Sequence, residues 1–303
     1  MEQIVDISSD GRHLSRDRGF LKVEADGAEV GRVPLDRIAA VILHGHGTTW
    51  TASLMVELAR RGALTVLCGR NHAPVALLWP IEGHHAQGGR MQAQWAASRP
   101  AMKQAWKMIV QSKIMMQAAA LRSVGEPDAP VSILARSVRS GDPANIEAQA
   151  ARRYWPLMMG KDFRRDVGGG GANGLLNYGY TVLRAATARA VIGAGLHPTI
   201  GLHHRAQGNS FALADDLMEP FRPLVDLAAR RIAREAGPDV TSEAKQALAR
   251  IIAFDMEVDG VTTPVSGMLS RLALSLARSF ESGRMELGLP KPPAPLRLME
   301  LGR

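Results

Sequence analysis

Short apolar and alternating runs fill the first part of the chain, from residue 3 to about residue 79. Runs such as QIVDIS, FLKVEA, IAAVILHG and LTVLCG are separated by Gly, Asp and Pro, which is typical of β-strands. One stretch, TASLMVELARRG, has apolar residues at 54, 55, 58 and 59, with Thr51 or Ser53 as a cap and Gly62 as a stop, and predicts a helix. We therefore expect a β-sandwich-like sheet domain with one helix over residues 1–80.

The pattern changes after Pro80. Residues 81–89 are polar and bear His84 and His85, which suits a solvated linker. From residue 90 onward the apolar period becomes helical, and residues 90–287 are expected to form a larger all-α domain. Together these patterns predict an α+β protein. Helical patterns lie within 91–125 and over 143–155, 174–194, 213–236, 242–254 and 265–282.

The last segment, 288–303, holds four prolines between residues 290 and 295. Such a segment is extended, and we expect it to be a loose tail.

Composition and charge narrow the possible partners. A chain of 303 residues with 46% hydrophobic residues can bury one large core or two ordinary ones. Its net charge of +8 favours a polyanionic partner such as nucleic acid. No run approaches the roughly 20 apolar residues of a bilayer span, and the start carries no signal pattern, so we expect a cytoplasmic protein without membrane contact. The single Cys68 lies in an apolar run and is expected to be buried and inert.

A first candidate for chemistry is the segment DPANIEAQAARRYW at 142–155. Asp142 is expected at the helix cap and Pro143 at the first helical position. Glu147 then lies one turn into the helix, where small neighbours on the same face leave room for a ligand or another chain. An isolated glutamate at this place would ordinarily pair with the helix dipole or with an arginine.

A second candidate is the segment GLHHRAQGNSFALADDLMEPFRP at 201–223. Asp216 and Glu219 are three positions apart and project from one helix face, with Asp215 close by. A hard cation such as Mg²⁺ or Mn²⁺ would relieve the repulsion between these carboxylates, and His204 could supply a nitrogen ligand. In the alternative interpretation, Asp215 and Asp216 are first-turn acids that meet the helix dipole.

Two prolines follow the acids directly. Neither Pro220 nor Pro223 can donate to the carbonyl four residues back, which belongs to Asp216 and Glu219 respectively. We expect them to kink the helix at the site and to free those two carbonyls.

Three motifs together resemble one known family. The motifs NIEAQAARRYW, NGLLNYGYTVLRAATARAVIGAGLHPTIGLHH and NSFALADDLMEPFRPLVD are similar to those of the CRISPR-associated integrase that inserts new spacers, in the form that accompanies type II systems. The resemblance covers nearly the whole chain, with the sheet domain first and the helical domain after it. It implies a metal-dependent DNA integrase and endonuclease that uses Mg²⁺ or Mn²⁺.

The resemblance also implies a site and partners. The metal ligands of the family fall on Glu147, His204 and Glu219, with Asp216 in support and His203 as an outside candidate for the nitrogen ligand. The implied reaction is attack by the 3′-OH of an incoming double-stranded DNA fragment on a phosphodiester at a repeat border of the CRISPR array. The implied assembly contains homodimers, formed by the sheet domain, and a small second CRISPR adaptation protein.

Basic residues near the motifs are the candidates for DNA binding, although each one taken alone could equally be a solvated charge. The loop at 161–174 adds four consecutive glycines, Gly168–Gly171, but lacks the ending of a phosphate-binding P-loop. Two alternatives stay open at this point: a general metal-dependent nuclease that does not integrate, and a DNA-binding scaffold without enzymatic activity. The basic candidates are Arg152, Arg153, Lys161, Arg164, Arg165, Arg205 and Arg222.

Overall fold

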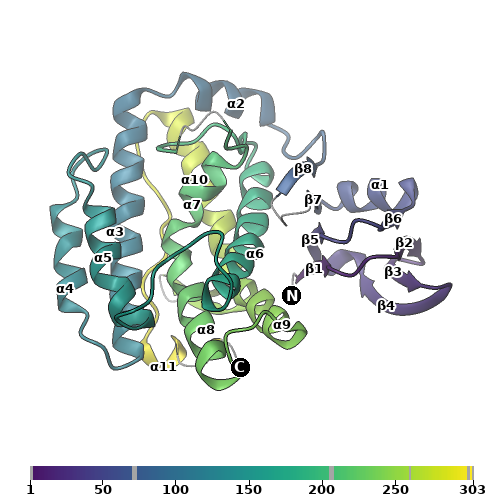
Figure 1. The fold of residues 1–303 in the computed structure, drawn as a ribbon. Helices are drawn as coiled ribbons and strands as arrows, with labels where there is room; N and C mark the ends of the chain where they lie inside the picture. The colour runs from purple at the N-terminus through teal and green to yellow at the C-terminus, as the bar shows by residue number, and fades with distance from the viewer. Residues whose placement is uncertain (1–2, 70–73, 205–207, 259–260, 299–300, 302–303) are drawn as a thin grey trace. The chain divides into compact units, whose positions relative to one another are not determined.

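The computed structural model describes residues 3–69, 74–204, 208–258, 261–298 and 301. The chain divides into two compact units, Met1–Gln87 and Gly88–Arg303 (Figure 1). The first unit is a sheet region with a helix and the second is mainly helical, so the predicted α+β class is confirmed.

The first unit contains two four-stranded sheets. One sheet has the order β4-β3-β2-β6 and the other the order β1-β5-β7-β8, in which β1, β5 and β7 run parallel. The side chains of β5 are buried throughout, which matches its unbroken apolar run. The elements are β1 (Gln3–Ile7), β2 (Arg12–Asp17), β3 (Phe20–Ala25), β4 (Ala28–Pro34), β5 (Ile38–Leu43), β6 (Thr49–Trp50), α1 (Ala52–Arg60), β7 (Leu64–Cys68) and β8 (Pro74–Leu78).

One apolar core joins both sheets of this unit to α1. It includes Leu14 and Leu21 from one sheet, Val41 from the other and Leu54 from the helix. Thr51 caps α1, because its hydroxyl accepts a hydrogen bond from the Leu54 N–H. Cys68 is buried, as predicted, and burial raises the pKa of its thiol to about 11, which disfavours the reactive thiolate.

The second unit is built around α6, whose side chains are buried on most sides. This helix packs against α7, α8, α9 and α10, and Gly179 lets it approach α8, since a Cβ there would lie 2.5 Å from Val225 Cγ1. The helices are α2 (Gln87–Ala96), α3 (Arg99–Ser123), α4 (Ala129–Ser132), α5 (Ile146–Met159), α6 (Ala172–Gly193), α7 (Ala212–Met218), α8 (Arg222–Glu235), α9 (Ser242–Ala249), α10 (Val265–Ser282) and α11 (Pro295–Leu298).

Two details of this unit differ from the sequence prediction. The unit is not all-α, because β9 (Asp255–Val258) and β10 (Val261–Pro264) form an antiparallel hairpin. The missed signal is the dipeptide Asp-Gly at 259–260, which favours hairpins between short strands. The tail is not loose either: Leu298 and Leu301 are buried, and α11 packs against α3. Isolated leucines among prolines carry no periodic pattern, so this packing was not foreseeable from the pattern.

In the part of the chain that the structure describes, no helix has the length and apolarity needed to cross a membrane.

Candidate active site

The helix that carries the acids is broken at the predicted place. Helix α7 ends at Met218, residues Glu219–Phe221 form a 3-10 turn, and α8 starts at Arg222. The predicted break is therefore confirmed. The predicted release of the Glu219 carbonyl is wrong, because that carbonyl accepts a hydrogen bond from the Arg222 N–H. A 3-10 bond reaches three residues instead of four, so the prolines do not prevent it.

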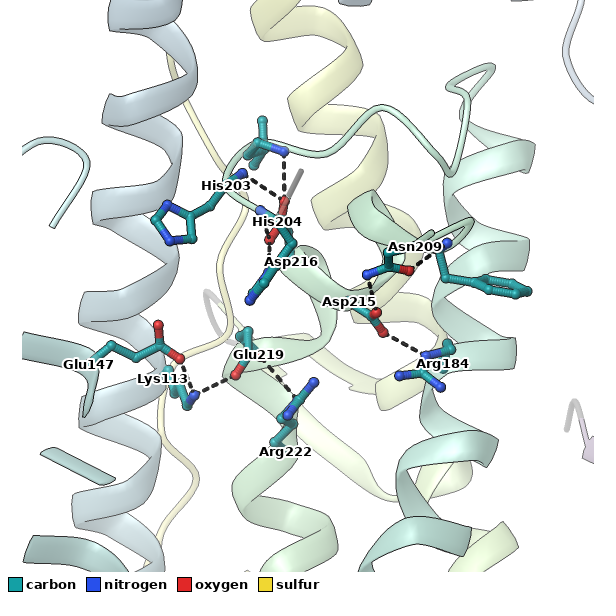
Figure 2. A network of polar contacts seen from close by, with 12 residues as sticks. Lys113, Glu147, Arg184, His203, His204, Asn209, Asp215, Asp216, Glu219 and Arg222 are labelled. Carbon is teal, nitrogen blue, oxygen red and sulfur yellow. Dashed lines mark hydrogen bonds and ion pairs between the residues drawn. The ribbon is translucent and has the colours of Figure 1, made fainter. Parts of the chain in front are cut away.

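Asp216 is the most enclosed acid of the site. Its side chain is 0% exposed, and its carboxylate accepts hydrogen bonds from the backbone N–H groups of Leu202, His203 and His204 at 2.6, 3.0 and 3.4 Å (Figure 2). The same carboxylate lies 2.5 Å from Nδ1 of His204. Because an ionised carboxylate only accepts, Nδ1 carries the hydrogen and Nε2 is left as the free ring nitrogen.

The close wrapping of the chain around Asp216 depends on Gly201. A Cβ at this position would lie 2.5 Å from the His204 carbonyl oxygen and 3.0 Å from Asp216 Oδ2. No side chain fits in that space, so glycine is required by the approach of backbone to carboxylate. Sequence reasoning missed this residue, although the glycine stands two positions before His203.

The two histidines have different surroundings. The ring of His203 stacks on the buried Trp106, with ring centroids 4.3 Å apart and nearly parallel planes. The ring of His204 meets Trp106 edge-on and pairs with Asp216, whose hydrogen bond raises the pKa of His204. The Glu219 and Glu147 carboxylates also raise that pKa, so this imidazole lies within electrostatic range of both acids. The preference for His204 over His203 as a ligand remains a prediction, which these contacts support.

Asp215 points away from this cluster. Its carboxylate accepts hydrogen bonds from Arg184 Nε at 2.6 Å and from Asn209 Nδ2 at 2.9 Å. Asn209 in turn accepts a hydrogen bond from the Phe211 N–H. Asp215 therefore fastens the segment before α7 to α6, a structural role close to the alternative interpretation of the first-turn acids.

The start of α5 positions Glu147. The helix begins at Ile146, with Asn145 as its cap, three residues later than predicted. Asp142 and Asn145 both have positive φ angles, so the backbone turns twice before it becomes helical. The side chain of Asp142 still caps the helix, since it accepts hydrogen bonds from the N–H groups of Ile146 and Glu147 at 2.8 and 3.0 Å. The predicted cap position of Asp142 is wrong, and so is the predicted helical position of Pro143, which lies before the helix; Glu147 is the second residue of α5.

Glu147 and Glu219 are brought together by a residue that sequence reasoning missed. Nζ of Lys113, on α3, lies 2.6 Å from Oε1 of Glu147 and 2.6 Å from Oε2 of Glu219 (Figure 2). Arg222 Nε lies 3.2 Å from the other oxygen of Glu219. Burial of the ammonium acts to lower the pKa of Lys113, but the Glu219 and Glu147 carboxylates outweigh it and raise that pKa.

A buried network lies behind Arg222. The guanidinium of Arg222 stands over the ring of Tyr180, 4.9 Å from its centroid. The hydroxyl groups of Tyr180 and Tyr154 both donate to Asp226. Desolvation raises the pKa of Asp226 to about 6, against the lowering effect of the two hydroxyl groups. This network keeps Arg222 in place beside Glu219.

The family model described as CRISPR associated protein Cas1 matches residues 5–238 of the chain. The chain belongs to the Cas1 family. A CRISPR-associated endonuclease Cas1 of Neisseria meningitidis is 36% identical over 257 residues, which is 84% of each protein. The Cas1 2 endonuclease of Pyrobaculum aerophilum is 28% identical over 297 residues, which is 92% of this chain and 99% of that protein.

Solved structures share the Cas1 fold. A casposase bound to integration product has a TM-score of 0.79 at 20% identity, with 97% of this chain and 94% of that chain covered. A Cas6-RT-Cas1–Cas2 complex has a TM-score of 0.73 at 18% identity, with 95% of this chain and 36% of that chain covered. At these identities the similarity concerns the fold.

The Cas1 site has the donor set of a divalent-metal centre. Among the described residues, no three His, Cys, Asp or Glu side chains already converge on one point, and the Lys113 ammonium lies between the two glutamates. Oε2 of Glu219 is buried, and its contact with Lys113 is an ion pair without an aligned hydrogen bond. Two carboxylates and an imidazole oriented by a second carboxylate suit Mg²⁺ or Mn²⁺. The chemistry of these donors is the basis on which a metal site at Glu147, Glu219 and His204 can be proposed.

The predicted DNA-binding residues fall into two groups. Arg165 and Arg222 are committed to internal contacts: Arg165 donates to Asn173 and Asn177, and Arg222 pairs with Glu219. The side chains of the second group are exposed, and those of Arg152, Arg153 and Arg164 donate to backbone carbonyls. Arg205 lies outside the described residues. The exposed group is Arg152, Arg153, Lys161 and Arg164.

Proposed function

We propose that this Cas1 protein is a metal-dependent DNA integrase and endonuclease of CRISPR adaptation. It joins the 3′-OH of a foreign DNA fragment to the repeat border of a CRISPR array by transesterification. The observation that carries the proposal is the meeting of Glu147 and Glu219 beside His204, whose ring is oriented by the buried Asp216.

Each side chain has a definite part in this proposal. Glu147 and Glu219 bind the cation through oxygens, and His204 binds it through Nε2 while Asp216 holds Nδ1. A divalent ion bound there supplies charge neutralisation at the scissile phosphate and acidifies the attacking hydroxyl. Exposed cations such as Arg152 and Arg164 bind the phosphate backbone of the DNA. No side chain of the protein is needed as a nucleophile.

The partners follow from the same proposal. Double-stranded DNA is the substrate as fragment and as repeat, and the solved casposase with its integration product supports this role. Residues 1–80 form a homodimer, and a small second adaptation protein completes the integrase, which the solved Cas1–Cas2 complex supports. Hydrolysis by the same site is a second activity, favoured by the endonuclease name of the curated relatives.

The test is a joining assay with the full-length protein. A labelled duplex with free 3′-OH ends is mixed with a supercoiled plasmid that carries a repeat array, with Mn²⁺ or EDTA and with or without the small partner. We expect label on the plasmid only with metal, and a loss of at least roughly 100-fold in Glu147→Ala and His204→Ala, because each removes a proposed ligand.

The matched control is Glu235→Ala, which removes an exposed acid from α8 and should leave joining unchanged. Plasmid cleavage without joining would favour the nuclease alternative. DNA binding that ignores metal, with neither reaction, would favour the scaffold.

A further inference from the structure

The ammonium of Lys113 lies between the two glutamate carboxylates of the site. Its side chain is 11% exposed, and its ammonium touches one carboxylate that is 22% exposed and another that is 3% exposed. These carboxylates come from α5 and from the turn after α7, so Lys113 on α3 is the group that connects three separate segments. Without it, two like charges would face each other in a largely buried space.

The two contacts of Lys113 differ in kind. With Glu147 the ammonium makes a hydrogen bond as well as an ion pair. With Glu219 it makes the ion pair alone, since Oε2 of that residue has no aligned hydrogen-bond donor. Glu219 is therefore held to Lys113 chiefly by charge, over the same 2.6 Å as Glu147.

A metal ion and the ammonium compete for the same oxygens. Arg222 already faces the other oxygen of Glu219, so an ion that binds both glutamates would compete with the ammonium for Glu219 Oε2. The ion carries twice the charge of the ammonium, and Arg222 stays beside Glu219 in either state. The lysine stem is long and flexible, which allows the ammonium to leave without movement of the helices.

We propose that Lys113 is an exchangeable counter-ion of the metal centre. In the metal-free protein its ammonium holds Glu147 and Glu219 together, and it leaves both carboxylates when a divalent cation binds. Lys113 is thus a positioning residue that prepares the two acids and opposes the metal at the same time. This inference rests on the proposed metal site.

A purely structural role for Lys113 predicts the opposite behaviour. If the lysine were a permanent strut, its removal would loosen the two glutamates and weaken metal binding. If it is an exchangeable counter-ion, its removal takes away a competitor and leaves a more negative site, so metal binding becomes tighter.

Isothermal titration calorimetry of the full-length protein with Mn²⁺ separates these roles. For Lys113→Met we expect Mn²⁺ affinity to rise roughly fivefold or more over wild type, together with a lower Tm in EDTA and a larger rise of Tm on adding Mn²⁺. The control is Lys103→Met, on an exposed position of the same helix, which should match wild type in both measurements. Unchanged or weaker Mn²⁺ binding in Lys113→Met would overturn the proposal.

A second measurement needs no variant and covers the case in which Lys113→Met does not fold. Wild-type protein is treated briefly with an amine-acetylating reagent, with Mn²⁺ or with EDTA, and modification of each lysine is read by mass spectrometry. We expect acetylation of Lys113 to increase at least threefold with Mn²⁺ relative to the exposed Lys103 in the same sample. Equal labelling in both conditions, with Mn²⁺ bound, would also overturn the proposal.

The outcomes distinguish this inference from the function on which it rests. If wild type binds no Mn²⁺ in the calorimeter, the proposed metal site fails. If wild type binds Mn²⁺ and joins DNA while Lys113 stays protected, the function stands and only the exchange is wrong.

Discussion

Two pairs of acidic residues lie in this site, and their carboxylates are bound by different kinds of group. Asp215 and Asp216 are bound by groups that belong to the fold: backbone amides, an asparagine and an arginine of α6. Glu147 and Glu219 are bound chiefly by the ammonium of Lys113. The first pair builds the site, and the second pair is the one proposed to bind an ion. Asp215 and Asp216 thus lie close to Glu219 in the sequence, but their carboxylates have different partners in the structure.

Removal of the Asp216 carboxylate is the strongest test of the difference between the two pairs. In Asp216→Ala three backbone N–H groups lose their acceptor, and a buried unpaired donor costs about 1 to 3 kcal/mol. We expect the free energy of unfolding to fall by about 3 kcal/mol or more, measured by urea denaturation in EDTA. Glu147→Gln, which keeps an acceptor for Lys113, should change it by less than about 1 kcal/mol. Equal losses in the two variants would remove the distinction between the pairs.

Asp226 is a buried acid of a third kind. Its closest partners are neutral hydroxyl groups, where the two pairs have backbone amides or a cation. Its pKa is raised to about 6 in the folded protein, so folding favours the protonated form. The stabilisation from that proton is complete below about pH 4 and is lost as the pH rises to about 6, a change on the order of 3 kcal/mol.

The measurement is the free energy of unfolding of wild type and Asp226→Asn between pH 4 and 8. We expect wild type to lose stability relative to the variant as the pH rises from 4 to about 6, and the difference to become constant above about pH 7. Parallel curves over the whole range would show that Asp226 does not take up a proton in the folded state.

Arg184 gives the smallest expected effect. In Arg184→Met, the buried Asp215 loses its ion pair with the partly exposed Arg184 but keeps the hydrogen bond from Asn209. We expect a loss of about 1 kcal/mol in the free energy of unfolding, with Mn²⁺ affinity unchanged, because Asp215 is not a proposed ligand. A clear drop in Mn²⁺ affinity would move Asp215 from the structural pair to the metal-binding pair.

The parts of the fold that were predictable are those with a long periodic signal. The sheet unit, the helix at 265–282 and the break at Pro220 follow from apolar period and proline chemistry within one segment. The hairpin at 255–264 and the packed tail depend on short segments whose burial comes from contacts with distant helices. The pattern within such segments is too short to carry that information.

The site shows the same division between local and distant signals. Spacing alone put Asp216 and Glu219 on one helix face and Glu147 near a helix start. Lys113 could not be found in this way, because it lies 34 positions from Glu147 on a helix with no motif of its own. The contrast between Asp215 and Asp216 was also beyond the sequence, since their neighbours in the chain are the same and their partners in space are not.

The wrapping of residues 201–204 around Asp216 has a consequence for how the site comes into being. The direction of the His204 ring depends on the placement of α7, because the Asp216 carboxylate on that helix accepts hydrogen bonds from three backbone N–H groups of residues 202–204. The proposed nitrogen ligand is thus oriented by the folded chain, and a peptide spanning residues 201–223 would lack Trp106 of α3, against which the rings of His203 and His204 pack.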